Sequence, residues 1–250
     1  RHADARARDR EDPPEHPLSR EPRQINNPFF TYGLSTMKIT DASVRPYPAG
    51  DSSLARIAAE AAELGFDSIV AIGEGALPGR GPAVLRGAVI GAASHKEVIR
   101  QVREPAVRRA DVVFVNAGDI SFNRAVVSVK EVQVLRNIHT TRKNAFDHVA
   151  ARSAAERGVA VDISMVPLIQ YRGTKRQRAL QRYEDILLLH RRYGFPLTIS
   201  SGACSILEQR SVREIRGLCA LFGMTGVEVS EALASVGRLI EPEQPVRVVG

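Results

Sequence analysis

The sequence predicts an α/β fold in which parallel strands and helices alternate and close into a TIM-barrel-like (β/α) barrel. Short apolar runs rich in β-branched residues alternate with segments whose apolar residues recur at helical spacing. This alternation is typical of βα units around a parallel sheet that is buried on both faces. At least seven strand-like runs follow one another without a central break, which favours a closed barrel over an open doubly wound sheet.

The first 36 residues differ in composition from the rest of the chain. They hold 6 basic and 6 acidic residues and 5 of the 14 prolines. Mixed charge and proline with few apolar residues cannot bury enough surface to offset the entropy of ordering. We therefore expect a disordered N-terminal extension over 1–36, followed by a single barrel domain over 37–250.

The elements of this domain follow from local composition. Strands are predicted at Lys38–Thr40, Ser68–Ile72, Val84–Ile90, Val112–Val115, Val132–Leu135, Val159–Ile163 and Leu197–Ser200. Helices are predicted at Ser52–Leu64, His95–Arg103, Ser121–Val127, Asn144–Arg157, Thr174–Tyr193 and Val212–Phe222. Four glycines stand where a left-handed residue would end a helix, namely Gly65, Gly158, Gly194 and Gly223. The apolar segment Val227–Ile240 either closes the barrel or offers a patch to a protein partner.

Positive charge is concentrated in the middle of the chain. Between Ser121 and Arg192 there are 14 Lys and Arg against 6 Asp and Glu, a net charge of +8, while the whole chain carries +7. A basic surface of this kind is typical of proteins that follow a polyphosphate backbone. A set of solvated, Arg-rich helix faces would give the same count.

The basic residues gather at two helices. Arg142, Lys143 and His148 surround the start of the helix predicted at Asn144–Arg157, where free backbone N–H groups favour an anion; Asp147 could pair with any one of them. The next helix carries a stripe formed by Lys175, Arg178 and Arg182, flanked by Arg172 and Arg176. Only 5% of residues are aromatic, so recognition of a folded RNA by shape and backbone fits better than base stacking.

Candidates for catalysis or metal binding are few. Asp41, Glu74 and His95 follow the first three predicted strands, at the end of the barrel where such folds place active sites. Their spacing matches no metal-binding motif, and we expect neither a metal site nor a catalytic residue. A metal-dependent phosphoesterase, or a barrel enzyme acting on a small phosphorylated substrate, remains the alternative.

Cysteine usage and hydropathy bear on the compartment. Cys204 and Cys219 follow no metal or disulfide pattern and are expected to be reduced thiols. No apolar run approaches the roughly 20 residues that span a bilayer, and no signal peptide is visible. We therefore expect a cytoplasmic protein with no membrane partner.

A group of motifs carries further information through its order and spacing. It comprises residues 145–150, 158–168 and 196–203, Gly223–Met224 and the long Arg-rich helix. Together these motifs resemble the ribonuclease P protein component 3 family of archaea and its eukaryal relatives, with similarity over about residues 37–241. That family is TIM-barrel-like and related to the polymerase-and-histidinol-phosphatase hydrolases but lacks their metal-binding histidines. Here Ile39–Ala42 stands where those hydrolases carry a His-x-His pair.

The resemblance implies a noncatalytic subunit of the ribonucleoprotein that removes the 5′ leader from precursor tRNA. It implies that the RNA performs the hydrolysis with bound Mg²⁺, and that the protein itself binds no cofactor. The implied partners are ribonuclease P RNA, precursor tRNA, ribonuclease P protein component 2 and other small basic subunits. The residues expected to contact RNA are Arg124, Arg142, Lys143 and His148, followed by Lys175, Arg176, Arg178 and Arg182.

Overall fold

The computed structural model describes residues 38–73 and 81–241, and in this part of the chain seven parallel strands form one sheet in sequence order. The strands are β1 (Thr40–Val44), β2 (Ser68–Ile72), β3 (Ala83–Ile90), β4 (Val112–Asn116), β5 (Val134–Arg136), β6 (Ala160–Ser164) and β7 (Leu197–Ser200). The sheet nearly closes, because Gly202 N donates to Ser43 O at 2.9 Å and Arg45 N donates to Ala203 O at 2.8 Å. The predicted TIM-barrel-like fold is confirmed. The predicted extension over 1–36 and the candidate Glu74 lie outside the described residues.

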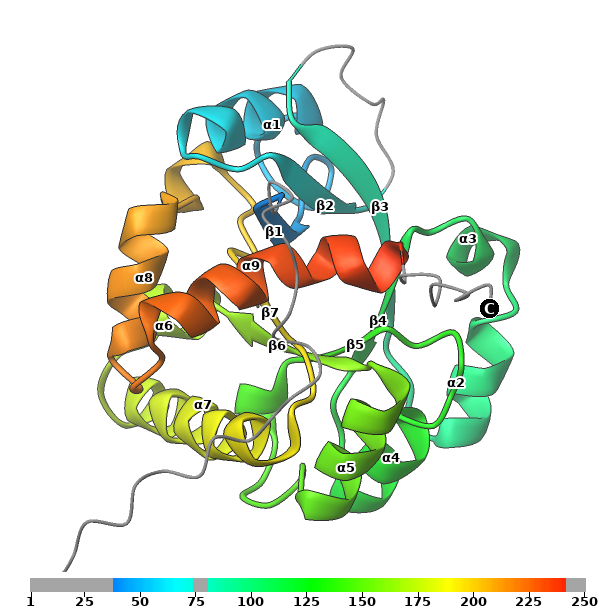
Figure 1. The fold of residues 1–250 in the computed structure, drawn as a ribbon. Helices are drawn as coiled ribbons and strands as arrows, with labels where there is room; N and C mark the ends of the chain where they lie inside the picture. Colours follow the sequence, from blue (N-terminus) through cyan, green and yellow to red (C-terminus); the bar gives the residue numbers. More distant parts are fainter. Residues whose placement is uncertain (1–37, 74–80, 242–250) are drawn as a thin grey trace, which may run out of the picture. The chain divides into compact units, whose positions relative to one another are not determined.

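Helices connect the strands and cover the outside of the barrel (Figure 1). They are α1 (Leu54–Glu63), α2 (His95–Gln101), α3 (Pro105–Arg108), α4 (Ile120–Val126), α5 (His148–Arg157), α6 (Val166–Gln170), α7 (Gly173–Tyr193), α8 (Val212–Ala220) and α9 (Gly226–Ile240), with short 3-10 turns η2 (Ile138–Thr140) and η3 (Ile206–Glu208). The four glycines predicted to be left-handed all have positive φ.

The last helix, α9, closes one end of the barrel. It lies across the strands in Figure 1, and its Val236 packs into the barrel interior with a buried cluster that includes Val70 and Phe114. The Ser235 hydroxyl donates to the carbonyl of Leu197, the first residue of β7, at 2.5 Å. Of the two roles considered for Val227–Ile240, the structure therefore shows closure of the barrel.

Two boundaries that matter for the site differ from those predicted. The first strand runs over Thr40–Val44 rather than Lys38–Thr40, so Asp41 is a buried strand residue and does not follow the strand. Its apolar pattern was hidden by the polar side chains of Asp41 and Ser43. Helix α5 begins at His148 rather than Asn144, because Asn144 has a φ of 66°, which no α-helix accommodates.

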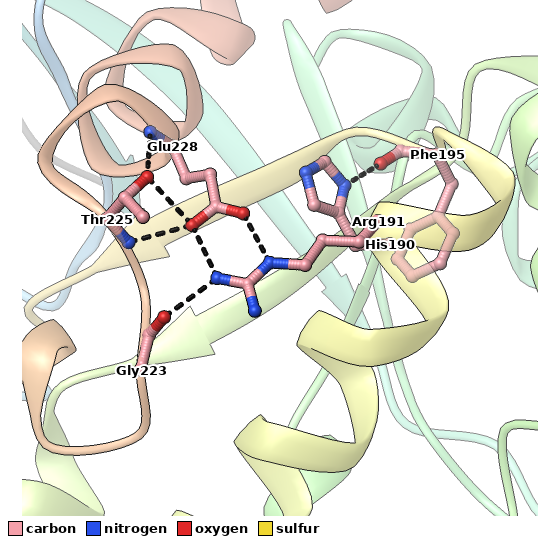
Figure 2. A network of polar contacts seen from close by, with 6 residues as sticks. All are labelled: His190, Arg191, Phe195, Gly223, Thr225 and Glu228. Carbon is pink, nitrogen blue, oxygen red and sulfur yellow. Dashed lines mark hydrogen bonds and ion pairs between the residues drawn. The ribbon is translucent and has the colours of Figure 1, made fainter. Parts of the chain in front are cut away.

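A polar clamp joins the C-terminal end of α7 to the start of α9 (Figure 2). The Arg191 guanidinium donates to both carboxylate oxygens of Glu228, at 2.7 and 3.0 Å, and to Gly223 O at 2.8 Å. Glu228 also accepts from the backbone and hydroxyl of Thr225, which completes a capping box. Although burial opposes ionisation, the hydrogen bonds from Arg191 and Thr225 lower the pKa of Glu228 to about 2. Arg191 is therefore a structural arginine despite its place in the basic stretch.

Candidate nucleic-acid interface

Basic residues from distant parts of the sequence meet at the C-terminal end of the barrel. Each helix runs back against its strand, so the segment after a strand and the first turn of the next helix lie at this end. Arg142 and Lys143 lie between β5 and α5, Arg172 and Lys175 lie at the start of α7 after β6, and Arg210 lies between β7 and α8. The fold therefore gathers onto one end residues that the sequence spreads over about 70 positions.

The first half of this surface is a groove of about 550 Å³, which we call the α5–α7 groove. Its ionisable lining residues are Arg142, Asp147, His148, Arg182 and Asp185, and its apolar lining includes Ile120, Ile138, Phe146, Ile186, Leu188 and Leu189. Three of the predicted RNA-contact residues thus lie around one groove, and Arg124 reaches it through Asp147.

Two arginines at this groove are paired with aspartates. The Arg124 guanidinium binds both oxygens of Asp147, with its Nε at 3.2 Å from Oδ1. The Arg182 guanidinium lies 2.9 Å from Oδ2 of Asp185 and also donates to Thr141 O. Each pair is neutral as a whole, so Arg124 and Arg182 add little positive charge to the groove.

Asp147 carries several functions at once. It caps α5 by accepting from Ala150 N at 3.1 Å, while it binds Arg124 and lies 3.8 Å from Nδ1 of His148. The helix N-terminus that was expected to attract an external anion is therefore already served by the chain's own carboxylate. Chiefly the hydrogen bond from Arg124 lowers the pKa of Asp147. Its stabilisation is present at neutral pH and is lost as the pH falls from about 4 through the lowered pKa.

Other predicted contacts point into solvent. Arg142, Lys143, Lys175 and Arg178 are exposed and make no ion pair with any described residue. Lys175 and Arg178 share a face of α7 with Arg182, as the spacing predicted. They remain candidate phosphate contacts.

Arg176, another predicted RNA contact, does not line the α5–α7 groove. It lines a second groove of about 580 Å³, the α7–α8 groove, together with Arg172, Arg210 and Glu214. Sequence reasoning gave Arg172 only a flanking place and did not single out Arg210. A tertiary contact between segments after β6 and after β7 forms this groove, and no spacing within one helix could reveal it.

The mouth of the barrel holds a buried polar cluster. Asp162 accepts from the hydroxyls of Ser200 at 2.7 Å and Thr198 at 3.0 Å. Arg136 is 7% exposed, its guanidinium lies 5.6 Å from the centre of the Phe114 ring, and its Nε has no partner among the described residues. Burial raises the pKa of Asp162, and the nearby Arg136 opposes that rise.

Burial also shifts the pKa of two further titratable groups at the mouth in the direction that favours the neutral form. Burial raises the pKa of Asp41 to about 6, against hydrogen bonds from Ser201 and Ser43. Burial, helped by the charge of Arg136, lowers the pKa of His139 to about 4. The Tyr183 hydroxyl donates to Ser164 O at 2.8 Å, so the His139 Nδ1, 3.2 Å away, is the donor in their contact.

This cluster lacks the arrangements that enzymes of several classes use. In the described ranges 38–73 and 81–241, no three His, Cys, Asp or Glu side chains form a group able to hold a metal ion. Within these ranges, two histidine side chains form hydrogen bonds: His139 with the Tyr183 hydroxyl and His190 with the carbonyl of Phe195. Neither bond joins an imidazole to a Ser or Cys nucleophile.

None of the helices in this part of the chain combines the length and apolar composition needed to cross a bilayer.

Comparison with known proteins gives consistent matches. The model of the family described as RNase P subunit p30 matches residues 36–244. The chain is 31% identical to ribonuclease P protein component 3 of Halobacterium salinarum over 202 residues, which are 76% of this chain and 85% of the relative. It is 36% identical to the protein of that name from Methanothermobacter thermautotrophicus over 153 residues, 61% of this chain and 62% of the relative.

The extent of these matches varies. The matched stretch spans about 62% of the relative from Methanothermobacter thermautotrophicus and 55% of the one from Methanococcoides burtonii. Among solved structures, a chain in the cryo-EM structure of archaeal ribonuclease P with mature tRNA superposes with a TM-score of 0.68 at 18% identity, covering 81% of this chain and 90% of that chain. The structural likeness supports the fold.

Proposed function

The chain belongs to the RNase P subunit p30 family, and from this membership we propose that it is a protein subunit of ribonuclease P that takes part in removing the 5′ leader from precursor tRNA. Its direct partner is ribonuclease P RNA, and precursor tRNA is bound in the same assembly. Ribonuclease P protein component 2 and other small basic subunits complete the particle. The observation that carries this proposal is the family match over residues 36–244.

The surface chemistry supports an RNA partner. Exposed basic side chains that have no ion-pair partner among the described residues lie at the barrel end where this fold places its functional residues. Arginine suits this role because its planar guanidinium binds two phosphate oxygens at once. Arg142, Lys143, Lys175, Arg176 and Arg178 are the contacts that we place first. Arg124 and His148 lie beside Asp147, and Arg182 lies beside Asp185. A phosphate that contacts any of these three side chains therefore competes with a carboxylate of the protein.

We assign no catalytic residue to the protein and propose that the RNA carries out the hydrolysis with Mg²⁺. The carboxylates of the barrel mouth bind neighbouring protein groups: Oδ1 of Asp41 accepts from Ser201 N at 2.9 Å, and Asp162 accepts from two hydroxyls. These bonds fix the orientation of both carboxylates, although the buried Oδ2 of Asp41 accepts no hydrogen bond from any described residue. The cytoplasm is the compartment that we propose.

Reconstitution tests the proposal. Adding the chain to ribonuclease P RNA and the other subunits should increase the rate of precursor-tRNA cleavage, while the chain alone with Mg²⁺ should cleave neither precursor tRNA nor generic phosphoesters. The Asp41→Asn variant should support cleavage within about twofold of the wild type. Cleavage by the isolated chain, or an Asp41→Asn complex that assembles but loses turnover, would contradict a noncatalytic role.

The same variant should also change how the stability of the protein depends on pH. A pKa of Asp41 near 6 means that the folded state keeps a proton that the unfolded state has lost, so wild-type stability falls between about pH 4 and pH 6. Asparagine does not titrate. Urea unfolding should therefore show Asp41→Asn gaining about 1–3 kcal/mol relative to wild type between about pH 4.5 and pH 7.5.

A further inference from the structure

The α7–α8 groove collects three arginines from two segments that are distant in sequence. Arg172 and Arg176 come from the start of α7, and Arg210 comes from the residue before the cap of α8. Leu168, Ile169 and Leu218 supply apolar lining, and Glu214 is the acidic lining residue. The lining therefore carries three positive charges against one negative charge.

Arg172 is the exposed N-cap residue of α7, with an extended backbone, and it lines the groove from just before the helix. Helix geometry directs Arg176 into the groove, because at about 100° per residue Arg176 projects from the same face of α7 as Ala179 and Tyr183, which are buried. This is the face that packs against the barrel, whereas Lys175 and Arg178 lie on the face toward the α5–α7 groove. Arg176 is accordingly partly buried, while Lys175 is exposed.

The other contacts of these arginines position them without neutralising them. The Nη1 of Arg172 donates to the carbonyls of Ile169 and Tyr171, at 2.6 and 3.0 Å. Arg210 donates its Nη1 to the carbonyls of Leu207 and Gln209, at 2.9 and 2.6 Å. The other N–H groups of these two guanidiniums, and all those of Arg176, make no hydrogen bond or ion pair within residues 38–73 and 81–241.

The neighbouring carboxylates are committed to backbone and amide groups. Glu214 accepts from the backbone and hydroxyl of Ser211, both at 2.8 Å, and these bonds lower its pKa. Glu208, beside the groove, accepts from Cys204 N at 2.7 Å and from the Gln170 amide at 3.1 Å. Neither forms an ion pair with a groove arginine, although the charge of Glu214 lies near Arg210.

We propose that the α7–α8 groove is a second RNA-binding site, which holds the phosphodiester backbone through Arg172, Arg176 and Arg210. This inference rests on the proposed function and names a site separate from the α5–α7 groove. An RNA backbone fits better than an acidic peptide because the exposed Lys175 and Arg178 continue the basic surface around α7 from one groove to the other. An extended polyanion can follow such a track, and each arginine fork matches two phosphate oxygens.

Arg176 gives the cleanest test, because its side chain makes no hydrogen bond to any residue of the described ranges whose loss could disturb the fold. Binding of the full chain to a ribonuclease P RNA transcript would be measured over about 50–200 mM salt. Arg176→Gln should weaken binding about 3- to 10-fold and flatten the slope of log affinity against log salt by about 0.7–0.9. Arg176→Lys should keep the slope and lose part of the affinity, because lysine retains the charge without the fork.

Arg103→Gln is the matched control. Arg103 is an exposed arginine in the turn after α2, at the opposite end of the barrel, and its side chain makes no hydrogen bond or ion pair with the part of the chain that the structure describes. It should bind RNA with wild-type affinity and slope. The combined replacement of Arg172, Arg176 and Arg210 by Gln should flatten the slope by about two units or more while leaving the circular dichroism spectrum unchanged.

The outcomes separate the groove from the proposed function. If the wild type binds the RNA and Arg176→Gln binds with the same affinity and slope, the groove proposal is wrong while the proposed function stands. If the wild type does not bind ribonuclease P RNA with or without the other subunits, both fail. A groove variant that keeps RNA binding but no longer binds another subunit would assign the groove to a protein partner and overturn the proposal.

Discussion

The two grooves beside α7 are lined by the same residue type and differ in what neutralises it. In the α5–α7 groove, Arg124 and Arg182 bind Asp147 and Asp185. In the α7–α8 groove, Arg172, Arg176 and Arg210 have carboxylates nearby, yet those carboxylates bind backbone and amide groups instead. A positive charge along a sequence therefore becomes available to a polyanion only where the fold leaves it without an internal partner.

The difference also separates structural from binding roles. An arginine bound to a carboxylate stabilises the fold, and its replacement lowers stability more than it lowers RNA affinity. An arginine whose fork is free adds little to stability, and its replacement changes the counterions released on RNA binding. Stability and salt slope are thus two measurements that sort the basic residues of this chain.

The largest effect is expected from breaking the pairing at Asp147. Asp147→Ala removes both the cap of α5 and the partner of Arg124, and should lower the free energy of unfolding by about 2 kcal/mol, measured by urea denaturation. Asp147→Asn is the control, because asparagine caps helices well while it carries no charge; it should cost about 1 kcal/mol.

Both Asp147 variants should also leave Arg124 without a carboxylate partner, as the arginines of the α7–α8 groove are. With Arg124 released, the slope of log RNA affinity against log salt should steepen by up to about 0.7–0.9. An unchanged slope with the expected loss of stability would show that Arg124 does not face RNA even when it is free.

An intermediate effect is expected from the unpaired residues of the α5–α7 side. The double variant Arg142→Gln and Lys143→Gln should weaken RNA binding about tenfold and flatten the salt slope by about 1.5, while the melting temperature stays within about 1 °C of the wild type. A drop in melting temperature without a change in slope would instead assign these residues to the fold.

The smallest effect is expected at His148, which lies at the start of α5 beside Asp147. His148→Ala should reduce RNA affinity by no more than about twofold, because Asp147 lies 3.8 Å from Nδ1 of His148 and competes with a phosphate for this side chain. Equal affinities of the variant and the wild type in a filter-binding assay would remove His148 from the interface.

Much of the fold could be predicted from the sequence, because the residues that define a strand or a helix end are neighbours along the chain. Continuous apolar strands such as Ser68–Ile72 and Leu197–Ser200 were predicted at their observed bounds, and the glycines that end α5 and α7 marked helix ends that only a left-handed residue allows. The first strand was misplaced because it contains the buried polar residues Asp41 and Ser43, and because Ser201, whose backbone N–H binds Asp41, lies 160 positions further along the chain.

In the candidate site, too, contacts within one helix could be predicted from the sequence, whereas contacts between elements could not. The pair between Arg182 and Asp185 lies three residues apart on one helix and was open to prediction from spacing. The pair between Arg124 and Asp147 joins α4 to the cap of α5 across 23 residues, and the α7–α8 groove joins segments that follow different strands. Neither could be found from periodicity.

By itself, the sequence determined the barrel, the family resemblance and the excess of basic residues at its centre, because apolar periodicity, motif order and charge are properties of residue order. Tertiary structure alone decided which of those basic residues are neutralised by a partner on another element, as Arg124 is by Asp147. Ion pairing depends on distances of a few ångströms between side chains from separate elements, and such distances exist only once the chain has folded.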